Sequence, residues 1–372
     1  MSEEAGDAKK EIKSRVVVFT GAGSLDKIVV NEENVVDPAE DEMRVTIKFV
    51  GVNFIDNLKK MGVYSKSLMG DTFPMVPGCE ASGVVDAVGS GLVDEFKPGD
   101  RVILFTDEGL CRDTICVKPH SVVRIPSDAM SLEDASCLAL NYLTAYDMLF
   151  KMCRLKPGDV VLMPQAAGGV GMAVIQLCKT VPDVTLIAIC SGAKHSLLNS
   201  MGVQHCIDYR TQKYPVEVKK ISPKGVDIVL DGLNGSDSLS FFNLLKPFGK
   251  VVHYGVANMA SEGSGLFKKL VTYYKCHQIN SAKIITTNRS MAGYHLGVLS
   301  QTSPEEMVSS WEAVFKLYAD GVIKPKIDSI FPLDMTKDAL SRMQKRENIG
   351  KILLSTEAKE PQIFTSVDQE QK

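Results

Sequence analysis

The residues whose types and spacing point most directly to chemistry form a glycine-rich stretch near the middle of the chain. Residues 160–171 read Val-Val-Leu-Met-Pro-Gln-Ala-Ala-Gly-Gly-Val-Gly, and an amphipathic segment follows at 172–178. An apolar strand, a tight glycine turn and a helix are the parts of a dinucleotide-binding unit. The N–H groups at the start of such a helix face the negative charge of a pyrophosphate. The stretch therefore predicts a site for a dinucleotide cofactor.

Two glycines of this turn are expected to have different functions. Gly168 lets the backbone bend and approach a pyrophosphate, because no side chain stands in the way, whereas Gly171 lets the helix pack closely on the strand. Ala166 occupies the first place of the stricter Gly-x-Gly-x-x-Gly pattern. Taken alone, the motif also fits an ordinary strand–turn–helix junction.

The residues after the second strand of the unit favour NADPH over NADH. A site for NADH usually carries an acidic residue there, but residues 189–194 read Ile-Cys-Ser-Gly-Ala-Lys. Ser191 can donate a hydrogen bond, and Lys194 can place a cation on a 2′-phosphate. Tyr209, just after the third strand, is placed to flank the adenosine end. Two alternatives stay open: Lys194 is a solvated residue at a helix start, or an acidic residue elsewhere reverses the preference.

A regular alternation of strands and helices must hold these residues in place. Beyond residue 160 the sequence predicts strands at 160–164, 185–190, 204–207, 226–230 and 250–254, with helices at 172–178, 194–201, 216–221 and 236–245. This pattern is typical of a parallel, doubly wound α/β sheet. In such a sheet the ligand binds at the carboxyl ends of the strands.

The first part of the chain has a different character. Short β-like runs at 16–20, 27–30 and 43–52 are separated by turn residues, which predicts an antiparallel, barrel-like region. The segment 131–150 reads as a helix with Ser131 as its N-cap. A length of 372 residues agrees with two domains.

Composition and charge restrict the classes of function. A net charge of −3 gives no electrostatic case for nucleic acid, and no apolar run approaches the ~20 residues that span a bilayer. The first fifteen residues lack the apolar region of a secretory signal. Nine scattered cysteines indicate no disulfide framework, so we expect a cytoplasmic protein. Cys111, Cys116 and His120 come nearest to a metal cluster, but their spacing matches no standard zinc site.

The segment 258–288 interrupts the alternation with apolar and aromatic residues among lysines. One interpretation is a helix that covers the substrate cleft or a partner subunit. Another is a contact with an anionic lipid surface, with aromatic rings in the headgroup layer and lysines on the lipid charge. The candidate residues for either function are Leu266, Phe267, Leu270, Tyr273 and Tyr274.

Taken in order, several motifs resemble those of the medium-chain dehydrogenase/reductase superfamily, in its zinc-free quinone oxidoreductase branch. The resemblance runs from about Arg15 to Leu354 and is carried by Gly51-Val52-Asn53-Phe54-Ile55-Asp56, Pro77-Gly78-x-Glu80, Gly99-Asp100-Arg101-Val102, Leu143-Thr144-Ala145-Tyr146 and Gly350-Lys351-Ile352-Leu353-Leu354. Within that branch the chain looks most like the synaptic vesicle membrane protein (vesicle amine transport protein) homologues. The pointers are residues 141–146, 166–177, 221–229 and 293–297. That group is described as cytosolic and peripheral to vesicle or mitochondrial outer membranes, with links to lipid binding.

The resemblance implies a Rossmann-like, doubly wound parallel sheet domain inserted in a GroES-like β-barrel catalytic domain. We expect the catalytic domain at 14–144 and again at 289–355, the NADP-binding domain at 145–288, and disordered tails at 1–13 and 356–372. Members of this family commonly form homodimers by joining sheets at the last strand, here within residues 290–296.

The resemblance also implies zinc-independent chemistry. The zinc alcohol dehydrogenases of the superfamily place their first cysteine ligand near Asn53, where this chain has an amide, so no metal is expected. Hydride must then go to an acceptor that needs little Lewis-acid help, such as a quinone or an α,β-unsaturated carbonyl. The resemblance places Asn53, Asp56 and Tyr64 beside the substrate, with Tyr64 as a proton donor. For Asn53 and Asp56, stabilisation of a turn is an equally good explanation. Lys60 stands where the family has an arginine.

The expected activity is therefore that of an NADPH-dependent oxidoreductase. The residues expected to bind the cofactor are Thr144, Ala167, Gly168, Gly169, Val170, Ser191, Lys194, Tyr209, Leu233, Tyr254, Gly255 and Lys351. One alternative is an NADPH-regulated, lipid-binding adaptor on vesicles or the mitochondrial outer membrane, with little catalysis. A second alternative is a zinc alcohol dehydrogenase.

Overall fold

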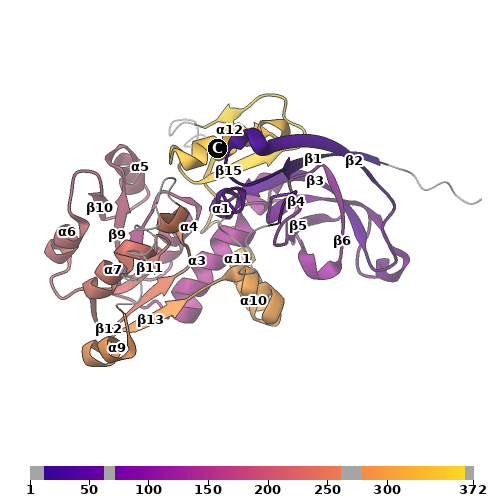
Figure 1. The fold of residues 1–372 in the computed structure, drawn as a ribbon. Helices are drawn as coiled ribbons and strands as arrows, with labels where there is room; N and C mark the ends of the chain where they lie inside the picture. The colour runs from indigo at the N-terminus through magenta and orange to yellow at the C-terminus, as the bar shows by residue number, and fades with distance from the viewer. Residues whose placement is uncertain (1–11, 63–71, 261–278, 365–372) are drawn as a thin grey trace, which may run out of the picture. The chain divides into compact units, whose positions relative to one another are not determined.

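The computed structural model describes residues 12–62, 72–260 and 279–364 (Figure 1). The chain divides into two compact units, which are described one at a time. The first unit is drawn from Met1–Ala139, Ser329–Glu347 and Ile352–Ile363, and the second from Leu140–Asp328, Asn348–Lys351 and Phe364–Lys372.

The second unit is built on a parallel sheet in the order β10-β9-β8-β11-β12-β13. Its strands are β8 (Val160–Pro164), β9 (Thr185–Cys190), β10 (His205–Asp208), β11 (Val226–Asp231), β12 (Leu245–His253) and β13 (Ser290–Gly293). Every residue of β11 is buried, as expected for a parallel strand covered on both faces. The strand order reverses between β8 and β11, where a doubly wound sheet binds its ligand. The predicted fold class is confirmed.

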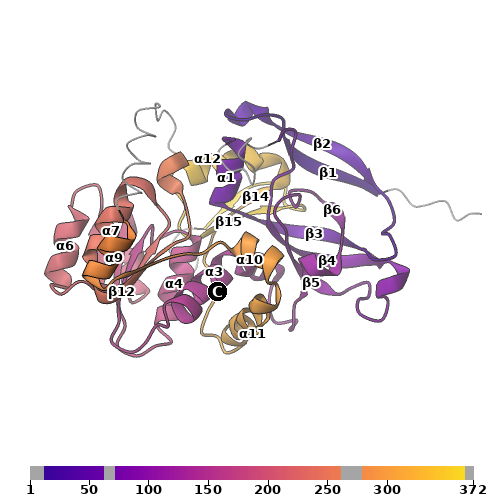
Figure 2. The same cartoon turned by 60° about the horizontal axis from the view of Figure 1, so that its bottom comes forward.

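The second unit also contains α-helices. They are α3 (Leu143–Tyr146), α4 (Gly169–Cys178), α5 (His195–Ser200), α6 (Tyr214–Ile221), α7 (Ser238–Leu244), α9 (Ser281–Thr287), α10 (Leu296–Thr302) and α11 (Glu305–Ala319). Short 3₁₀ turns lie at Gly192–Lys194, Gly235–Asp237 and Ala257–Ala260. Figure 2 shows α6, α7 and α9 together on one side of the sheet. On that side Val218, Phe241 and Phe242 pack into one core with strand residues such as Leu162 and Val229.

The first unit is mainly antiparallel. Its larger sheet has the order β16-β14-β15-β3-β4-β5-β7, with β6 also paired to β3, and a separate ribbon pairs β1 with β2. The strands are β1 (Ile12–Phe19), β2 (Ile28–Val35), β3 (Met43–Val52), β4 (Glu80–Val88), β5 (Arg101–Phe105), β6 (Thr114–Val117), β7 (Val122–Arg124), β14 (Ile327–Pro332), β15 (Lys351–Ser355) and β16 (Gln362–Ile363). Its helices are α1 (Phe54–Lys60), α2 (Leu132–Ala135) and α12 (Thr336–Gln344), with 3₁₀ turns at Leu25–Lys27, Ser90–Leu92, Pro119–Ser121 and Leu333–Met335. This is the GroES-like part of the predicted fold.

Strand pairing corrects the predicted ends of the chain. The sequence predicts tails at 1–13 and 356–372, but β1 begins at Ile12, which pairs with Val35, and Ile363 of β16 pairs with Ser329. Polar side chains in both segments hid these strands, since the stabilising bonds are made by the backbone. The structure also places β13 beside β12 in the parallel sheet. Residues 289–328 therefore belong with the second unit, whereas the sequence analysis assigned them to the catalytic domain.

The predicted helix at 131–150 is confirmed over most of its length, as α-helical and π-helical segments in succession. The Ser131 hydroxyl accepts a hydrogen bond from the Asp134 N–H at 3.0 Å, so the predicted N-cap is confirmed. After α2 the chain makes a π-helical segment (Leu138–Tyr142), then α3, then a second π segment (Asp147–Met152). Such widened turns occur often at functional sites.

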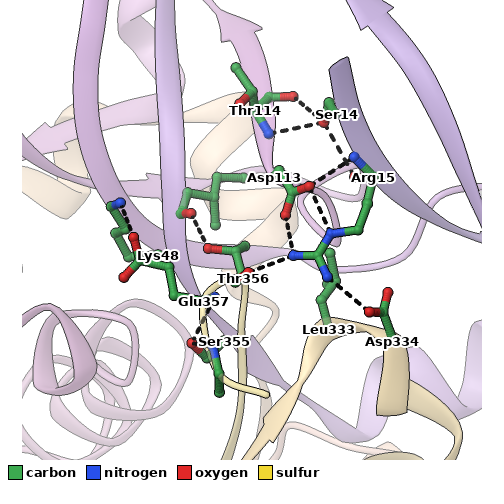
Figure 3. Close-up of polar contacts among 12 residues, drawn as sticks. Ser14, Arg15, Lys48, Asp113, Thr114, Leu333, Asp334, Ser355, Thr356 and Glu357 are labelled. Atoms are coloured by element: carbon green, nitrogen blue, oxygen red, sulfur yellow. Dashed lines mark hydrogen bonds and ion pairs between the residues drawn. The ribbon is translucent and has the colours of Figure 1, made fainter. Parts of the chain in front are cut away.

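Arg15 ties together segments of the first unit that are far apart in the sequence (Figure 3). Its guanidinium donates to both carboxylate oxygens of Asp113, at 2.9 and 3.0 Å, and to a carboxylate oxygen of Asp334 at 2.9 Å. It also donates to the carbonyl oxygen of Thr356 at 2.5 Å. One side chain thus joins β1 to the segments before β6, after β14 and after β15.

Among the residues that the structure describes, no helix combines the length and the apolar character needed to cross a bilayer.

Candidate functional site

The glycine turn lies between β8 and α4, as predicted. Gln165 has a φ of 57°, which turns the chain directly after the strand, and the Gly168 N–H donates to the Gln165 carbonyl at 2.9 Å. Gly168 is the N-cap of α4. By helix geometry the first N–H groups of α4 have no partner within the helix. The turn therefore presents backbone donors to an anion at the carboxyl end of the central strand.

The two glycines differ in what surrounds them. A Cβ atom on Gly171 would lie 2.2 Å from the carbonyl oxygen of Ala166, so only glycine fits there. The close approach is to the turn itself, and not to the strand as the sequence analysis expected. Among the described residues, a Cβ atom on Gly168 would meet only the Gln165 carbonyl oxygen, at 3.3 Å, and the Gly168 φ of −83° suits any residue. The space beside Gly168 is thus open on the side where a ligand would approach.

The loop after β9 is fastened to the glycine turn. The Lys194 ammonium donates to the Asn348 carbonyl at 2.6 Å, and the Asn348 amide donates to the Gly350 carbonyl at 2.9 Å. The Gly350 N–H in turn donates to the Ala167 carbonyl at 3.0 Å. Lys194 is therefore held close to the turn by a brace formed by residues 348–350, which the sequence analysis did not identify.

A carboxylate also lies beside this loop. A Cβ atom on Gly192 would stand 2.8 Å from an Asp208 carboxylate oxygen. The Arg210 N–H donates to that carboxylate at 2.9 Å, and hydrogen bonds from the Arg210 and Gly192 backbones lower the Asp208 pKa. Asp208 ends β10, not β9, so a search for an acidic residue after the second strand does not find it. An acidic residue outside the second strand, which the sequence left open, thus lies beside Gly192.

A buried carboxylate shapes the loop after β11. Asp231 accepts hydrogen bonds from the Leu233 and Asn234 N–H groups, each at 2.9 Å, and from the Ser238 hydroxyl at 3.1 Å. The second carboxylate oxygen also lies 2.9 Å from the Nδ1 atom of His253. These bonds fix the backbone around Leu233.

Tyr254 and Gly255 pack against that same loop. A Cβ atom on Gly232 would lie 2.8 Å from both the Tyr254 hydroxyl and the Gln165 side-chain oxygen, and one on Gly255 would lie 2.6 Å from the Gly232 carbonyl. Removal from water and the nearby Asp231 charge raise the Tyr254 pKa well above its ordinary value. The loops after β8, β11 and β12 therefore meet at the carboxyl end of the sheet.

The structure thus gathers most of the predicted cofactor residues at one edge of the second unit. Residues after β8, β9, β10, β11 and β12 lie in consecutive loops there, namely Ala167, Gly168, Gly169, Val170, Ser191, Lys194, Tyr209, Leu233, Tyr254 and Gly255. Thr144 is buried in α3, and Lys351 is buried directly after the Gly350 contact. Asn141, which the sequence analysis quoted only as part of a motif, lies against Gly169.

On the first unit, Asn53 and Asp56 hold a turn. The Asn53 N–H donates to the Asp56 carboxylate at 2.8 Å, and the Gly78 N–H donates to the other oxygen at 3.1 Å. The Asn53 amide donates to the Glu80 carboxylate at 2.8 Å and to the Gly51 carbonyl at 3.0 Å. These are the bonds expected of the turn-stabilising alternative. Contact with a substrate remains a prediction for both residues. Tyr64 lies outside the described residues.

The same region contains two buried cysteines. Cys79 lies 3.6 Å from the Asn53 amide, and burial raises the pKa of Cys111 well above its ordinary value. The Cys111 thiol therefore favours the protonated form, which binds metal poorly. Within residues 12–62, 72–260 and 279–364, no three His, Cys, Asp or Glu side chains are grouped to hold a metal ion. The five membrane or lid candidates, Leu266, Phe267, Leu270, Tyr273 and Tyr274, lie outside the described residues.

Comparison with known proteins agrees with this architecture. Residues 39–127 match the family model of the alcohol dehydrogenase GroES-like domain, and residues 201–354 match the zinc-binding dehydrogenase model. The synaptic vesicle membrane protein VAT-1 homolog of Danio rerio is 43% identical over 92% of this chain and 70% of its own length.

Solved structures give the same result. The human synaptic vesicle membrane protein VAT-1 homolog-like protein is 34% identical, with a TM-score of 0.79 over 93% of this chain and 99% of that one. The Escherichia coli quinone oxidoreductase complexed with NADPH is 27% identical, with a TM-score of 0.79 over 92% of this chain and 99% of that one. The chain therefore belongs to the medium-chain dehydrogenase/reductase superfamily of oxidoreductases, in the group of the synaptic vesicle membrane protein VAT-1 homologues.

Proposed function

We propose that the protein is a zinc-independent, NADPH-dependent oxidoreductase that transfers hydride to a quinone or an α,β-unsaturated carbonyl. The observation that carries the proposal is the open backbone at Gly168, directly before the amino end of α4. The Escherichia coli relative, a quinone oxidoreductase solved in complex with NADPH, supports the same cofactor and acceptor class for this chain.

The residues of the second unit suit a phosphorylated dinucleotide. The N–H groups at the start of α4 would bind the pyrophosphate. Lys194 would bind the 2′-phosphate by exchanging its 2.6 Å bond to the Asn348 carbonyl for a bond to phosphate oxygen. The Asp208 carboxylate is already bound to backbone N–H groups, which spreads its charge into the loop. NADPH supplies the hydride when it is bound.

The first unit would supply orientation and a proton. The turn formed by Asn53 and Asp56 is fixed by buried hydrogen bonds. In this proposal the turn contacts the acceptor and holds it in one orientation. Tyr64 is the proposed proton donor, and general acid help of this kind contributes about 10²–10⁴ in rate. A conjugated acceptor spreads the negative charge that forms on hydride addition, so a hydroxyl group suffices where an isolated carbonyl would need a Lewis acid.

The test is stopped-flow oxidation of bound NADPH by a small quinone and by a simple enone. Saturating turnover above the rate without protein is the expected result. Failure of the folded protein to quench or shift the fluorescence of NADPH would overturn the proposal. A gain in activity with added zinc, together with stoichiometric bound zinc, would instead favour a zinc alcohol dehydrogenase.

A second function is favoured by the similarity to the VAT-1 homologues, which are known as synaptic vesicle membrane proteins. In this alternative, NADPH regulates a lipid-binding adaptor that resides in the cytoplasm or peripherally on vesicles or the mitochondrial outer membrane. Flotation with anionic liposomes, measured beside the quinone assay, separates the two. Turnover without flotation supports the enzyme, and flotation without turnover supports the adaptor.

We further propose that the protein is a homodimer joined through β13. This strand is the last in the order of the described sheet, and Met291 on it is 43% exposed. An edge strand of this kind can pair with its copy in a second chain. Met291→Lys should convert a dimer to a monomer in multi-angle light scattering. A wild-type monomer at all concentrations would contradict the proposal.

A further inference from the structure

Asn141 is a buried amide at the amino end of the nucleotide-site helix. It lies in the π-helical segment Leu138–Tyr142 and is 5% exposed. A Cβ atom on Gly169, the first residue of α4, would lie 2.5 Å from the Asn141 amide nitrogen and 2.9 Å from its oxygen. The side chain therefore packs directly over the start of α4, and the absence of a side chain on Gly169 makes room for it.

The neighbouring residue fixes this position. The Tyr142 hydroxyl donates to the Gln176 side-chain oxygen at 3.2 Å, and Gln176 lies two turns along α4. Gln176 itself donates to the Lys324 carbonyl and accepts from the Lys324 N–H, each at 2.8 Å. The π segment is thus joined to α4 by the bond between Tyr142 and Gln176, and Gln176 is itself held by its two bonds to Lys324. Because Asn141 directly precedes Tyr142, this bond also holds Asn141 at the amino end of α4.

The Asn141 amide itself has no such partners. Among the described residues no hydrogen bond from the Asn141 side chain is found, and the enclosed polar atoms without a partner lie elsewhere, on Asn57, His195 and Arg289, so the Asn141 amide is not sealed off from solvent. A buried amide without a partner lowers stability, so most buried amides in proteins are hydrogen-bonded. Asn53 of the first unit, which is buried to a similar degree, follows this rule with two bonds from its amide. An unpaired amide beside a helix amino end is what a site for an anionic ligand requires before the ligand binds.

We propose that Asn141 is a further cofactor-binding residue, whose side-chain N–H donates to a phosphate oxygen of the dinucleotide at the amino end of α4. The proposal rests on the proposed function, because it assigns a contact within that nucleotide site. Phosphate is favoured over a neutral group because the backbone N–H groups at the same helix end attract negative charge. The amide would extend that row of donors by one.

Asn141→Asp tests the assignment because the side chain keeps its shape while the N–H donor is replaced by a negatively charged acceptor. A carboxylate near the amino end of a helix stabilises the helix, so the melting temperature without ligand should stay at the wild-type value or rise. The Kd for NADPH, from fluorescence titration, should increase about tenfold or more, which corresponds to about 1.4 kcal/mol. ADP, which carries the pyrophosphate, should lose a similar factor in calorimetry. The deficit should shrink as the pH falls, because the protonated carboxyl is again a donor.

Asn141→Ala guards against a variant that does not fold, and it too should weaken NADPH and ADP together. Wild-type affinities for both ligands in either folded variant would overturn the proposal and leave Asn141 as a packing residue. Weaker NADPH with unchanged ADP would place the contact away from the phosphates and would also overturn it. If the wild-type protein binds neither ligand, the proposed function itself fails, a result distinct from a loss confined to the variants.

Discussion

The two glycines of the turn provide the sharpest test of the nucleotide site. Alanine at Gly171 should lower the stability of the protein, whereas alanine at Gly168 should lower its affinity for NADPH. At Gly171 the added Cβ atom would lie 2.2 Å from the Ala166 carbonyl oxygen, roughly 1 Å inside contact distance. Overpacking of this kind costs about 1–3 kcal/mol. The gain in helix propensity from glycine to alanine returns at most about 1 kcal/mol. Because the obstacle is backbone and cannot turn away, we expect Gly171→Ala to lower stability by about 2 kcal/mol.

Gly168→Ala should leave stability nearly unchanged. Its φ of −83° and ψ of 175° suit alanine, and the methyl group would meet only the Gln165 carbonyl oxygen, at 3.3 Å. Loss of chain freedom in the unfolded state stabilises by about 0.4–1 kcal/mol, which roughly offsets the poorer N-cap. The same methyl group would occupy the place where a pyrophosphate approaches the backbone. NADPH affinity should therefore fall by about tenfold or more.

Urea unfolding and NADPH fluorescence titration of the two variants complete this test. Each variant serves as the control for the other, since both add one methyl group to the same turn. The reasoning is refuted if Gly168→Ala binds NADPH like the wild type, or if Gly171→Ala matches the wild type in stability. An equal loss of affinity in both variants, at equal stability, would also contradict the separate functions of the two glycines.

Three further predictions concern charge. Lys194→Glu should weaken the binding of NADPH far more than that of NADH in parallel titrations. The bond from Lys194 to the Asn348 carbonyl is lost whichever cofactor is tested, so equal losses of affinity would contradict the assignment of Lys194 to the 2′-phosphate. Arg15→Met should lower the free energy of unfolding by about 2 kcal/mol, because several charge-assisted hydrogen bonds at a half-buried site are lost. A change below about 0.5 kcal/mol in urea unfolding would show that hydrogen bonds to water replace them. Asp208→Asn should lower the melting temperature at neutral pH. Since the pKa of Asp208 is lowered on folding, its stabilisation exists above the ordinary value of 3.8 and disappears as the pH falls through the folded-state pKa; a difference from wild type that persists in strong acid would contradict this.

The sequence predicts the nucleotide-binding unit well because its signals are local. Apolar runs set the strands, and the glycine turn sets the start of α4, so the order of the sheet and most of its loop residues follow. Asp208 and Asn141 escape prediction for a different reason. Asp208 reaches Gly192 through the register of two neighbouring strands, and Asn141 lies against Gly169 from a π-helical segment. Neither strand register nor a π turn leaves a local mark in the sequence.

The ends of the chain show a second limit of sequence reasoning. Ile12 and Ile363 have polar neighbours, Lys13 and Gln362, yet each joins a strand because a partner elsewhere in the chain supplies the backbone bonds. At Asn53 and Asp56 the sequence allowed two explanations, and the hydrogen bonds found there are those of a turn. Substrate contact at that turn can be tested only with a ligand. Long-range pairing thus decides features that composition alone leaves open.

The bonds made by Arg15 have a consequence for synthesis of the protein on the ribosome. Its partners Asp334 and Thr356 leave the ribosome more than three hundred residues after Arg15 itself, and β15, the neighbour of β3, is made equally late. In the nascent chain, the β3 edge and the Arg15 guanidinium therefore lack these partners until the last part of the chain has been synthesised. Premature termination near the carboxyl end would leave that edge uncovered, so we expect truncated products to aggregate or be degraded and not to persist as active fragments.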